Sequence, residues 1–294
     1  MLGLKKLKPD KEKLMRFVFL FSACVCILAV ALICIFLFGS GLPFFGKVNV
    51  WEFLTGTKWS PDTFDASNGV YQILPMIIGS LYVTAGAVVI GAPIGILSGV
   101  WLARFCPKPL LRPIKSAVAL MAGVPSVVYG FFGITTLVPL IRNTFGGNGF
   151  SILTASVLLA MMILPTIIQL THSALMAVPD SYFEGSLALG ATKERTVFRA
   201  ELRAAKSGIL AAVVLGIGRA IGETMAVVMV AGNQPRMPKG LLKGIRTLTS
   251  NIVMEMGYAA DMHREALIAT GVVLFVFILL INLCFSALNR RQTQ

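Results

Sequence analysis

Long apolar segments alternate with short polar stretches along the chain. A membrane-spanning helix needs about 20 consecutive apolar residues. Six windows of this kind are present, at residues 17–38, 74–101, 114–140, 152–175, 208–231 and 266–288. The pattern predicts an all-α, polytopic membrane protein with six transmembrane helices. The first window is longer than the apolar core of a signal peptide and lacks its cleavage site, which favours an uncleaved helix.

Composition and charge support this class and orient the helices. Only 13% of the residues are charged, whereas about a quarter are charged in soluble domains. The net charge of +13 is spread between the apolar windows, which is typical of helix flanks and argues against a nucleic-acid partner. Seventeen Lys and Arg residues fall on the side of the chain ends and eight on the other side. Both termini are therefore expected in the cytoplasm.

These windows divide the chain into segments. We expect a basic cytoplasmic tail, a first transmembrane helix, an extracytoplasmic loop and a core of five helices that contains a long cytoplasmic loop. Their residues are 1–16, 17–38, 39–70 and 71–289, with the cytoplasmic loop at 179–206. The five cysteines lack the spacing of metal ligands, so no metal site is expected.

Two opposite charges interrupt the fifth window. Arg219 and Glu223 are four residues apart in an otherwise apolar stretch. On a continuous helix this spacing places both side chains on one face, where they can pair. Charges at bilayer depth usually line a bundle interior or a water-filled path. We therefore expect either a substrate pathway here or an ion pair that only holds helices together.

Helix-breaking and small residues occur in several windows. Three prolines each remove a backbone hydrogen bond within a predicted span, which is tolerated where protein or a cavity satisfies the freed carbonyl: Pro93, Pro125 and Pro165. Ser126 follows the second of them and is a further candidate pathway residue. Three glycines at four-residue spacing allow another helix to approach closely: Gly91, Gly95 and Gly99.

The long cytoplasmic loop has the signals of two short helices. Ser181 and Glu184 form a capping box that predicts a helix start. Gly190 is placed to end this helix in the left-handed conformation. Thr192 can then cap a second helix that runs through Arg203. Such an ordered, protruding element is suited to a groove on a partner protein.

The loop at 232–265 is open to two interpretations. Its five basic residues surround apolar positions with the spacing of an amphipathic helix. Such a helix would lie at the outer headgroup layer. The other interpretation is a basic vestibule that attracts an anion.

The sequence EGSLALG at 184–190 resembles the EAA motif of type I ABC importer permeases, in which Glu and Gly have the same interval. The resemblance implies the permease fold and assigns the contact with an ATPase to the following residues: Glu184, Gly185, Ser186, Leu187, Gly190, Ala191 and Leu202. The chain departs from the I-x-L-P end of the family motif at Ala200 and Arg203, where the motif has isoleucine and proline, while Leu202 is retained.

A second resemblance concerns the substrate. The run GIGRAIGETMAV at 216–227 is similar to the corresponding helix of phosphate-specific permeases of the PstC type, and residues 71–84 and 124–130 resemble the same subunits. The substrate pathway is then expected at four residues: Arg219, Glu223, Thr224 and Ser126.

The resemblance implies several partners in a bacterial cell membrane. They are a PstA-like sibling permease, a pair of ATPase subunits, an extracytoplasmic phosphate-binding protein and membrane lipid. ATP and Mg would be used by the ATPase subunits, because Ala191 stands where a P-loop needs its lysine. The chain itself is thus expected to hold no cofactor and not to be an enzyme.

Three alternatives remain at this point. The first is a type I ABC permease for sulfate or molybdate. The second is a secondary transporter in which Arg219 and Glu223 relay ions or protons. The third is a membrane scaffold or sensor that transports nothing.

Overall fold

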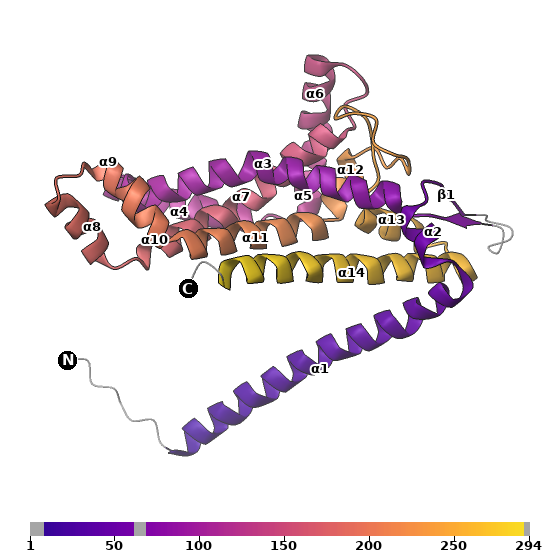
Figure 1. The fold of residues 1–294 in the computed structure, drawn as a ribbon, viewed down its shortest axis with the longest axis horizontal. Helices are drawn as coiled ribbons and strands as arrows, with labels where there is room; N and C mark the ends of the chain where they lie inside the picture. The colour runs from indigo at the N-terminus through magenta and orange to yellow at the C-terminus, as the bar shows by residue number, and fades with distance from the viewer. Residues whose placement is uncertain (1–8, 62–68, 291–294) are drawn as a thin grey trace.

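The computed structural model describes residues 9–61 and 69–290, which fold mainly into helices (Figure 1). In chain order the elements are α1 (Pro9–Lys47), α2 (Val50–Thr55), β1 (Trp59–Ser60), β2 (Val70–Tyr71), α3 (Leu74–Arg104), α4 (Lys108–Gly123), α5 (Ser126–Phe132), the π-helical turn η2 (Gly133–Leu137), α6 (Val138–Phe145), α7 (Ile152–Met176), α8 (Asp180–Ala188), α9 (Lys193–Thr196), the π-helical turn η3 (Val197–Glu201), α10 (Leu202–Ala204), α11 (Lys206–Gly222), α12 (Met225–Val230), α13 (Leu248–Glu255) and α14 (Asp261–Arg290).

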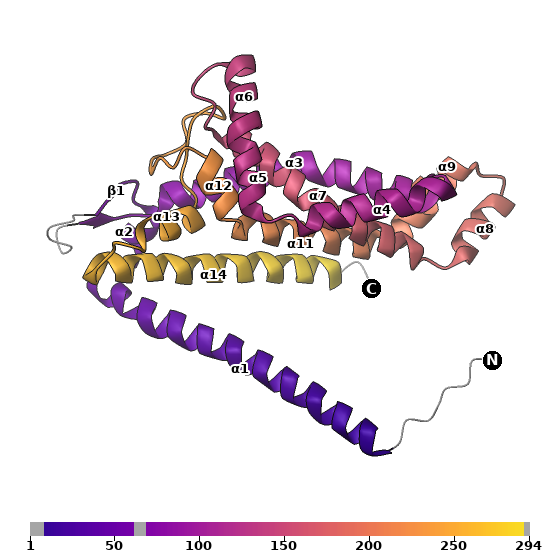
Figure 2. The ribbon, with the colours of Figure 1, turned by 180° about the vertical axis from the view of Figure 1, so that it is seen from behind.

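The long helices form one elongated bundle. Helices α3, α7, α11 and α14 run side by side along its length, with α8 and α9 at one end (Figures 1 and 2). The opposite end carries α2 and the antiparallel pair β1–β2, in which Trp59 lies opposite Tyr71. We call these two ends the α8–α9 end and the β-hairpin end.

Four of the six predicted spans are continuous helices in the described part of the chain. The stretches long and apolar enough to cross a bilayer lie in α1, α3, α7 and α14, and they match the first, second, fourth and sixth windows. The third and fifth windows are bent or broken. Six spans result when each bent pair of helices counts as one.

The prediction of one helix over 114–140 is wrong. Helix α4 ends at Gly123, and the run from α5 to α6 leaves it at an angle of 94°. The residue before a proline is restricted to extended backbone, and Val124 has ψ 127° directly before Pro125. The hydroxyl of Tyr129 donates to the carbonyl of Met121 at 3.0 Å, so it satisfies a group that the break exposes. Pro93 and Pro165 lie within continuous helices.

The glycines of the second window bring α3 against α7, as predicted. A Cβ atom at Gly91 would lie 3.0 Å from Ile163, and one at Gly95 would lie 2.8 Å from Ile167. Both distances are shorter than ordinary contacts between side chains, so only glycine permits this approach. The spacing therefore fixes the central helix pair of the bundle.

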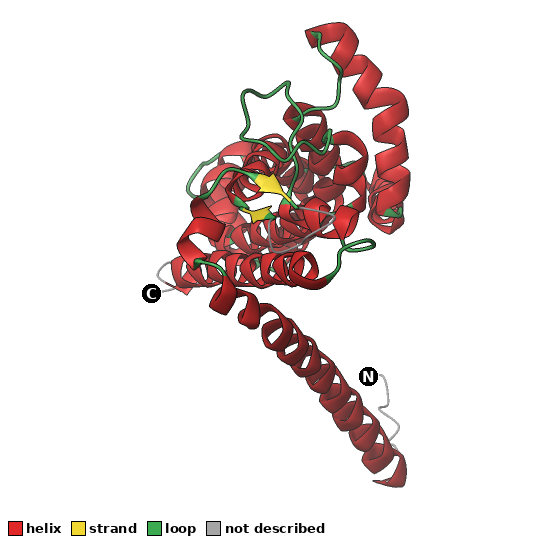
Figure 3. Ribbon diagram, turned by 90° about the vertical axis from the view of Figure 1, so that its right-hand side faces the viewer, coloured by secondary structure: helices red, strands yellow, loops and turns green. Residues whose placement is uncertain are grey.

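Helix α1 diverges from the bundle (Figures 1 and 3). It packs on α14 only near the β-hairpin end, where the rings of Phe38 and Phe275 meet edge to face at 5.7 Å. Towards its N-terminus the apolar side chains are exposed on all sides. A helix that is apolar all round is suited to lipid or to another membrane helix. The helix also continues to Lys47, beyond the predicted end at residue 38.

An aromatic cluster orders part of the segment predicted as a loop over 39–70. Phe44 and Phe53 are completely buried, and their rings lie 5.2 Å apart. Trp59 and Tyr71 add to the cluster from the two strands, with ring centroids 5.6 Å apart. Residues 62–68 of this segment lie outside the described residues.

The segment 232–255 does not form the predicted surface helix, and the interpretation as a basic vestibule stays a prediction. Residues before Leu248 are irregular, and α13 is packed into the bundle with Ser250 and Asn251 completely buried. Arg246 is turned inward and forms an ion pair with Glu255. Its guanidinium also donates to the side chain of Asn251 at 2.9 Å and to the carbonyl of Asn233 at 3.2 Å. One of the basic residues therefore belongs to the protein interior and not to an open vestibule.

Glu255 connects four segments at the β-hairpin end. Besides Arg246, its carboxylate accepts a hydrogen bond from the indole of Trp59 at 2.9 Å. It also lies 2.9 Å from the imidazole of His263 in α14. These contacts join β1, α13, α14 and the loop before α13, so both carboxylate oxygens have partners in a buried environment.

Replacing this carboxylate should destabilise the protein strongly. Removal of one partner of a buried ion pair leaves an unpaired charge and costs about 3–5 kcal/mol. We expect Glu255→Ala to lower the free energy of unfolding by this amount in detergent-solubilised protein. Glu265→Ala is the control, because its pair with Lys47 is largely exposed and should contribute about 1 kcal/mol or less. Equal losses in the two variants would contradict a structural role for the buried network.

Candidate functional site

The protruding element at the α8–α9 end comprises residues 180–204, which we call the α8–α10 hairpin. Helix α8 begins at Asp180, with Pro179 at the N-cap and no side-chain cap. The predicted capping box of Ser181 and Glu184 is therefore wrong. Pro179 already has the dihedral angles of a helix-flanking residue, so Ser181 falls inside the first turn and cannot cap it.

The turn within the α8–α10 hairpin forms as predicted. Gly190 has φ +84°, a left-handed conformation that favours glycine. Its N–H donates to the carbonyl of Leu187 at 2.8 Å, and the N–H of Ala191 donates to that of Ser186 at 3.2 Å. These two bonds make a Schellman motif. The hydroxyl of Thr192 then accepts a hydrogen bond from the backbone N–H of Arg195 in α9 at 3.3 Å, as predicted for a cap.

The α8–α10 hairpin has an exposed and an inward face. Leu189 is 90% exposed at its tip, and Leu187 is 40% exposed. Glu184 and Gly185 are also exposed. Phe183 and Leu202 instead pack against a buried cluster of the bundle: Val100, Leu175, Val178, Val197, Ala205 and Ile209. The predicted contact residues therefore include a group that faces outward, towards the space where a partner could bind.

A buried ion pair holds this hairpin to the bundle. Arg104, at the end of α3, donates from Nε to one oxygen of Glu201 at 2.9 Å and lies 2.6 Å from the other oxygen through Nη2. Nη2 also donates to the carbonyl of Leu175 at 3.3 Å. The Glu201 side chain is completely buried. The pair thus consists of one hydrogen bond and one close ion-pair contact, both from the same guanidinium.

Sequence reasoning did not identify the pair of Arg104 and Glu201. Arg104 was counted only as a basic flank, and Glu201 only as part of a departure from the family motif. The available signal was an acidic residue within the apolar inward face of a predicted helix, because a buried carboxylate requires a partner.

Arg219 lies in the last turn of α11 and is half-buried. Its guanidinium donates to the hydroxyl of Thr166 in α7 at 3.2 Å. The predicted ion pair with Glu223 does not form in the described part of the chain. Helix α11 ends at Gly222, and Glu223 has extended backbone with ψ 131°. The four-residue spacing therefore no longer places the two side chains on one helical face.

Glu223 stabilises the break between α11 and α12. Its carboxylate accepts from the N–H of Ala226 at 3.3 Å, in the first turn of α12. Its carbonyl accepts from the hydroxyl of Thr249 at 3.1 Å. Thr224 is the residue before α12, and its hydroxyl donates to the carbonyl of Gly222 at 3.3 Å. The polar side chains here thus satisfy backbone groups that a continuous helix would pair.

The structure brings the two helix breaks into one region of the bundle. Ser126 is the first residue of α5 and is half-buried. Helix α5 packs on α12, and a Cβ atom at Gly130 would lie 3.2 Å from the Cα of Ala226. The expected pathway residues of α5 and α12 therefore belong to helices in direct contact, whereas Arg219 points to α7.

No group of three His, Cys, Asp or Glu residues in the described chain is placed to hold a metal ion. All five cysteines are free thiols. The candidate site consists instead of Arg219 beside a helix break and of the α8–α10 hairpin, which joins the start of α11 through a bend of 71°. A cation at the end of α11 can bind an anion, and the hairpin can transmit a displacement to this helix.

Sequence comparison finds relatives over most of the chain. The family described as "Binding-protein-dependent transport system inner membrane component" matches residues 91–294. The chain is 39% identical to the probable ABC transporter permease protein YqgH of Bacillus subtilis, over 89% of this chain and 87% of that protein. It is 35% identical to the phosphate transport system permease protein PstC of Mesorhizobium japonicum, over 79% and 76%.

Solved structures share the fold. A chain of the MetNI methionine ABC transporter, in an inward-facing conformation, matches with a TM-score of 0.61 at 20% identity, over 76% of this chain and 96% of that chain. A bacterial ABC transporter involved in the import of alginate matches with a TM-score of 0.62 at 16% identity, over 98% and 100%. The chain therefore belongs to the binding-protein-dependent transport system inner membrane component family and has the predicted type I ABC importer permease fold.

Proposed function

We propose that the chain is the membrane permease subunit of an ATP-driven importer of inorganic phosphate. The observation that carries this proposal is the half-buried guanidinium of Arg219 in α11, which has no carboxylate partner among the described residues. Arginine binds oxyanions through parallel N–H groups. The relatives whose names include phosphate transport support this anion over others.

The α8–α10 hairpin is the proposed contact with the ATPase subunits. Its tip exposes Leu187 and Leu189, while Arg104 and Glu201 fix its base to the bundle. A displacement of the tip would thus move α11 and Arg219 as one body. In this proposal a PstA-like sibling permease completes the pathway, and an extracytoplasmic binding protein delivers phosphate at the β-hairpin end.

The charge distribution supports the orientation required by this arrangement. With both termini in the cytoplasm, the side that carries the α8–α10 hairpin holds seventeen of the basic residues. The hairpin then faces the compartment in which ATP is available. We propose that the chain lies in the cell membrane of a bacterium, in agreement with its bacterial relatives.

Uptake by the reconstituted importer tests the substrate. The chain would be purified with a PstA-like sibling permease, an ATPase and a phosphate-binding protein from the same organism, and placed in vesicles with ATP on the hairpin side. We expect labelled phosphate to enter in an ATP-dependent manner, and an excess of unlabelled phosphate to compete. Sulfate and molybdate should not compete at the same concentration. If sulfate or molybdate competed more strongly than phosphate, that anion and not phosphate would be the substrate.

Arg219 should be required for transport. Loss of a hydrogen bond to a charged group costs about 1.5–3 kcal/mol, so Arg219→Ala should lower phosphate uptake by about tenfold to a hundredfold. Arg142→Ala is a matched control, because Arg142 is exposed on α6. Arg219→Lys retains the charge but not the parallel donors. Phosphate uptake by this variant should lie between that of the unaltered importer and that of Arg219→Ala. Unchanged uptake by a normally assembled Arg219→Ala importer would refute the pathway role.

A further inference from the structure

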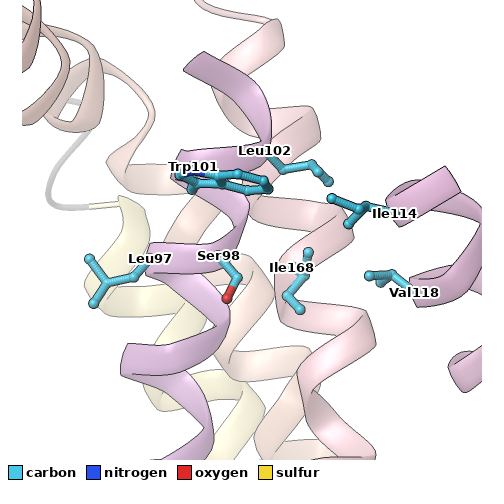
Figure 4. Close-up of a pocket in the computed structure, with 7 residues that line it drawn as sticks. All are labelled: Leu97, Ser98, Trp101, Leu102, Ile114, Val118 and Ile168. Atoms are coloured by element: carbon cyan, nitrogen blue, oxygen red, sulfur yellow. The ribbon is translucent and has the colours of Figure 1, made fainter. Parts of the chain in front are cut away.

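A crevice opens between α3, α4 and α7, and one part of it is apolar (Figure 4). This part has a volume of about 450 Å³. It is lined by seven residues, of which only Ser98 and the indole of Trp101 carry polar side-chain atoms: Leu97, Ser98, Trp101, Leu102, Ile114, Val118 and Ile168.

A second cavity adjoins the first and has a different character. Leu102 and Val118 line both, so the two cavities are continuous. The second has a volume of about 280 Å³ and is lined by four polar side chains, in addition to Ala119 and the two shared residues: Lys115, Gln169, His172 and Ser173. We call it the Lys115 cavity.

The four polar side chains of the Lys115 cavity have no partner in the described protein. None of them forms a side-chain hydrogen bond or an ion pair with another described residue. Lys115, Gln169 and Ser173 are exposed and His172 is half-buried, so a ligand can reach all four side chains from outside the bundle. The ammonium group of Lys115 attracts an anion to this position. Gln169, His172 and Ser173 can each donate a hydrogen bond. The cavity thus offers one fixed charge and several donors to the same small ligand.

The Lys115 cavity continues a polar line that starts at Arg219. Thr166 accepts the hydrogen bond from Arg219, and Gln169 and Ser173 follow it at intervals of three and four residues. This spacing places the three side chains on one face of α7. From Thr166 to Ser173 the helix rises by about 10 Å. The line runs from Arg219 towards the α8–α9 end of the bundle.

Basic residues of α4 approach the same cavity. Lys108, Arg112 and Lys115 lie four and three residues apart, on one face of this helix. Lys115 is the one farthest along the helix from its N-terminus, and only Lys115 lines the cavity. A row of this kind raises the local concentration of anions.

We propose that the Lys115 cavity is a second binding site for a phosphate group, on the cytoplasmic side of Arg219. This inference rests on the proposed function, since it assigns the site to phosphate that has passed Arg219. A phospholipid headgroup presents the same chemistry, and its acyl chain would fit the adjoining apolar cavity. In either case the phosphate oxygens contact Lys115, Gln169 and Ser173.

Acylation of lysine side chains measures occupancy in the unaltered protein. The assembled importer, in nanodiscs of zwitterionic phosphatidylcholine, is treated with an amine-acylating reagent, and the rate at each lysine is followed by mass spectrometry. Inorganic phosphate is titrated against chloride at constant ionic strength. We expect phosphate to protect Lys115 at least about threefold. Lys108, exposed on the same helix outside the cavity, is the internal control and should react at an unchanged rate.

Two variants distinguish specific binding of phosphate in the Lys115 cavity from nonspecific attraction of phosphate to the basic residues of α4. Loss of a hydrogen bond to a charged group costs about 1.5–3 kcal/mol, so Gln169→Ala should raise the phosphate concentration for half-protection by about tenfold to a hundredfold. Ser173→Ala should act in the same direction. Leu120→Ala, on the exposed side of α4, should leave the titration unchanged. Equal protection of Lys108 and Lys115, or variants without effect, would overturn the proposal.

A second set of nanodiscs distinguishes the sources of the phosphate group. Protection by inorganic phosphate in phosphatidylcholine assigns the site to free phosphate. Protection without added phosphate, seen only when anionic phosphatidylglycerol is included, assigns it to a lipid headgroup. Protection in neither condition overturns the site. Uptake of labelled phosphate by the same preparation is measured in parallel: uptake without protection refutes this site alone, and protection without uptake refutes the proposed function alone.

Discussion

The ion pair between Arg104 and Glu201 determines how the functional parts of this permease are connected. Glu201 is completely buried, and a buried carboxylate is stable only with a cation and additional donors. Arg104 supplies the cation and one hydrogen bond to this carboxylate, while its guanidinium also donates to a carbonyl at the end of α7. The base of the α8–α10 hairpin is therefore held against α3 and α7 at once. Without this pair, only apolar contacts would hold the hairpin against the bundle.

The membrane imposes a second constraint, which explains the polar groups around the broken helices. Backbone groups freed by a break in a transmembrane helix need partners from the protein. Tyr129 supplies one at the break after α4. Glu223 supplies one at the break after α11. Because Glu223 is used in this way, Arg219 is left with Thr166 as its protein partner and with capacity to bind an anion.

The sequence predicted the features that depend on local chemistry or on strict periodicity. Four of the six windows as continuous helices, the left-handed Gly190, the cap by Thr192 and the glycine contact between α3 and α7 all appear in the structure. Each follows from residues close in sequence or from one repeated spacing.

The incorrect predictions share a physical cause. The pairing of Arg219 with Glu223 assumed a continuous helix, but hydropathy does not report where backbone geometry ends one. Pro125 was recognised as a breaker, yet the size of the bend depends on the helices that α5 packs against. The partners of Glu201 and Arg246 are distant in sequence, so single-sequence spacing could not identify them. A secondary transporter based on a relay from Arg219 to Glu223 loses its main support with that pair.

The central claim is that the rigid base of the α8–α10 hairpin transmits ATP-driven motion to Arg219. The number of ATP molecules hydrolysed per phosphate imported, measured in the reconstituted importer, tests it most directly. Glu201→Gln removes the charge that holds Arg104, and Glu194→Gln, on the exposed surface of α9, is the matched control. We expect a ratio at least about tenfold higher for Glu201→Gln, because a hairpin base that has lost its buried ion pair would let ATP be hydrolysed without moving Arg219, and an unchanged ratio for Glu194→Gln. A normally assembled Glu201→Gln importer with the wild-type ratio would contradict it.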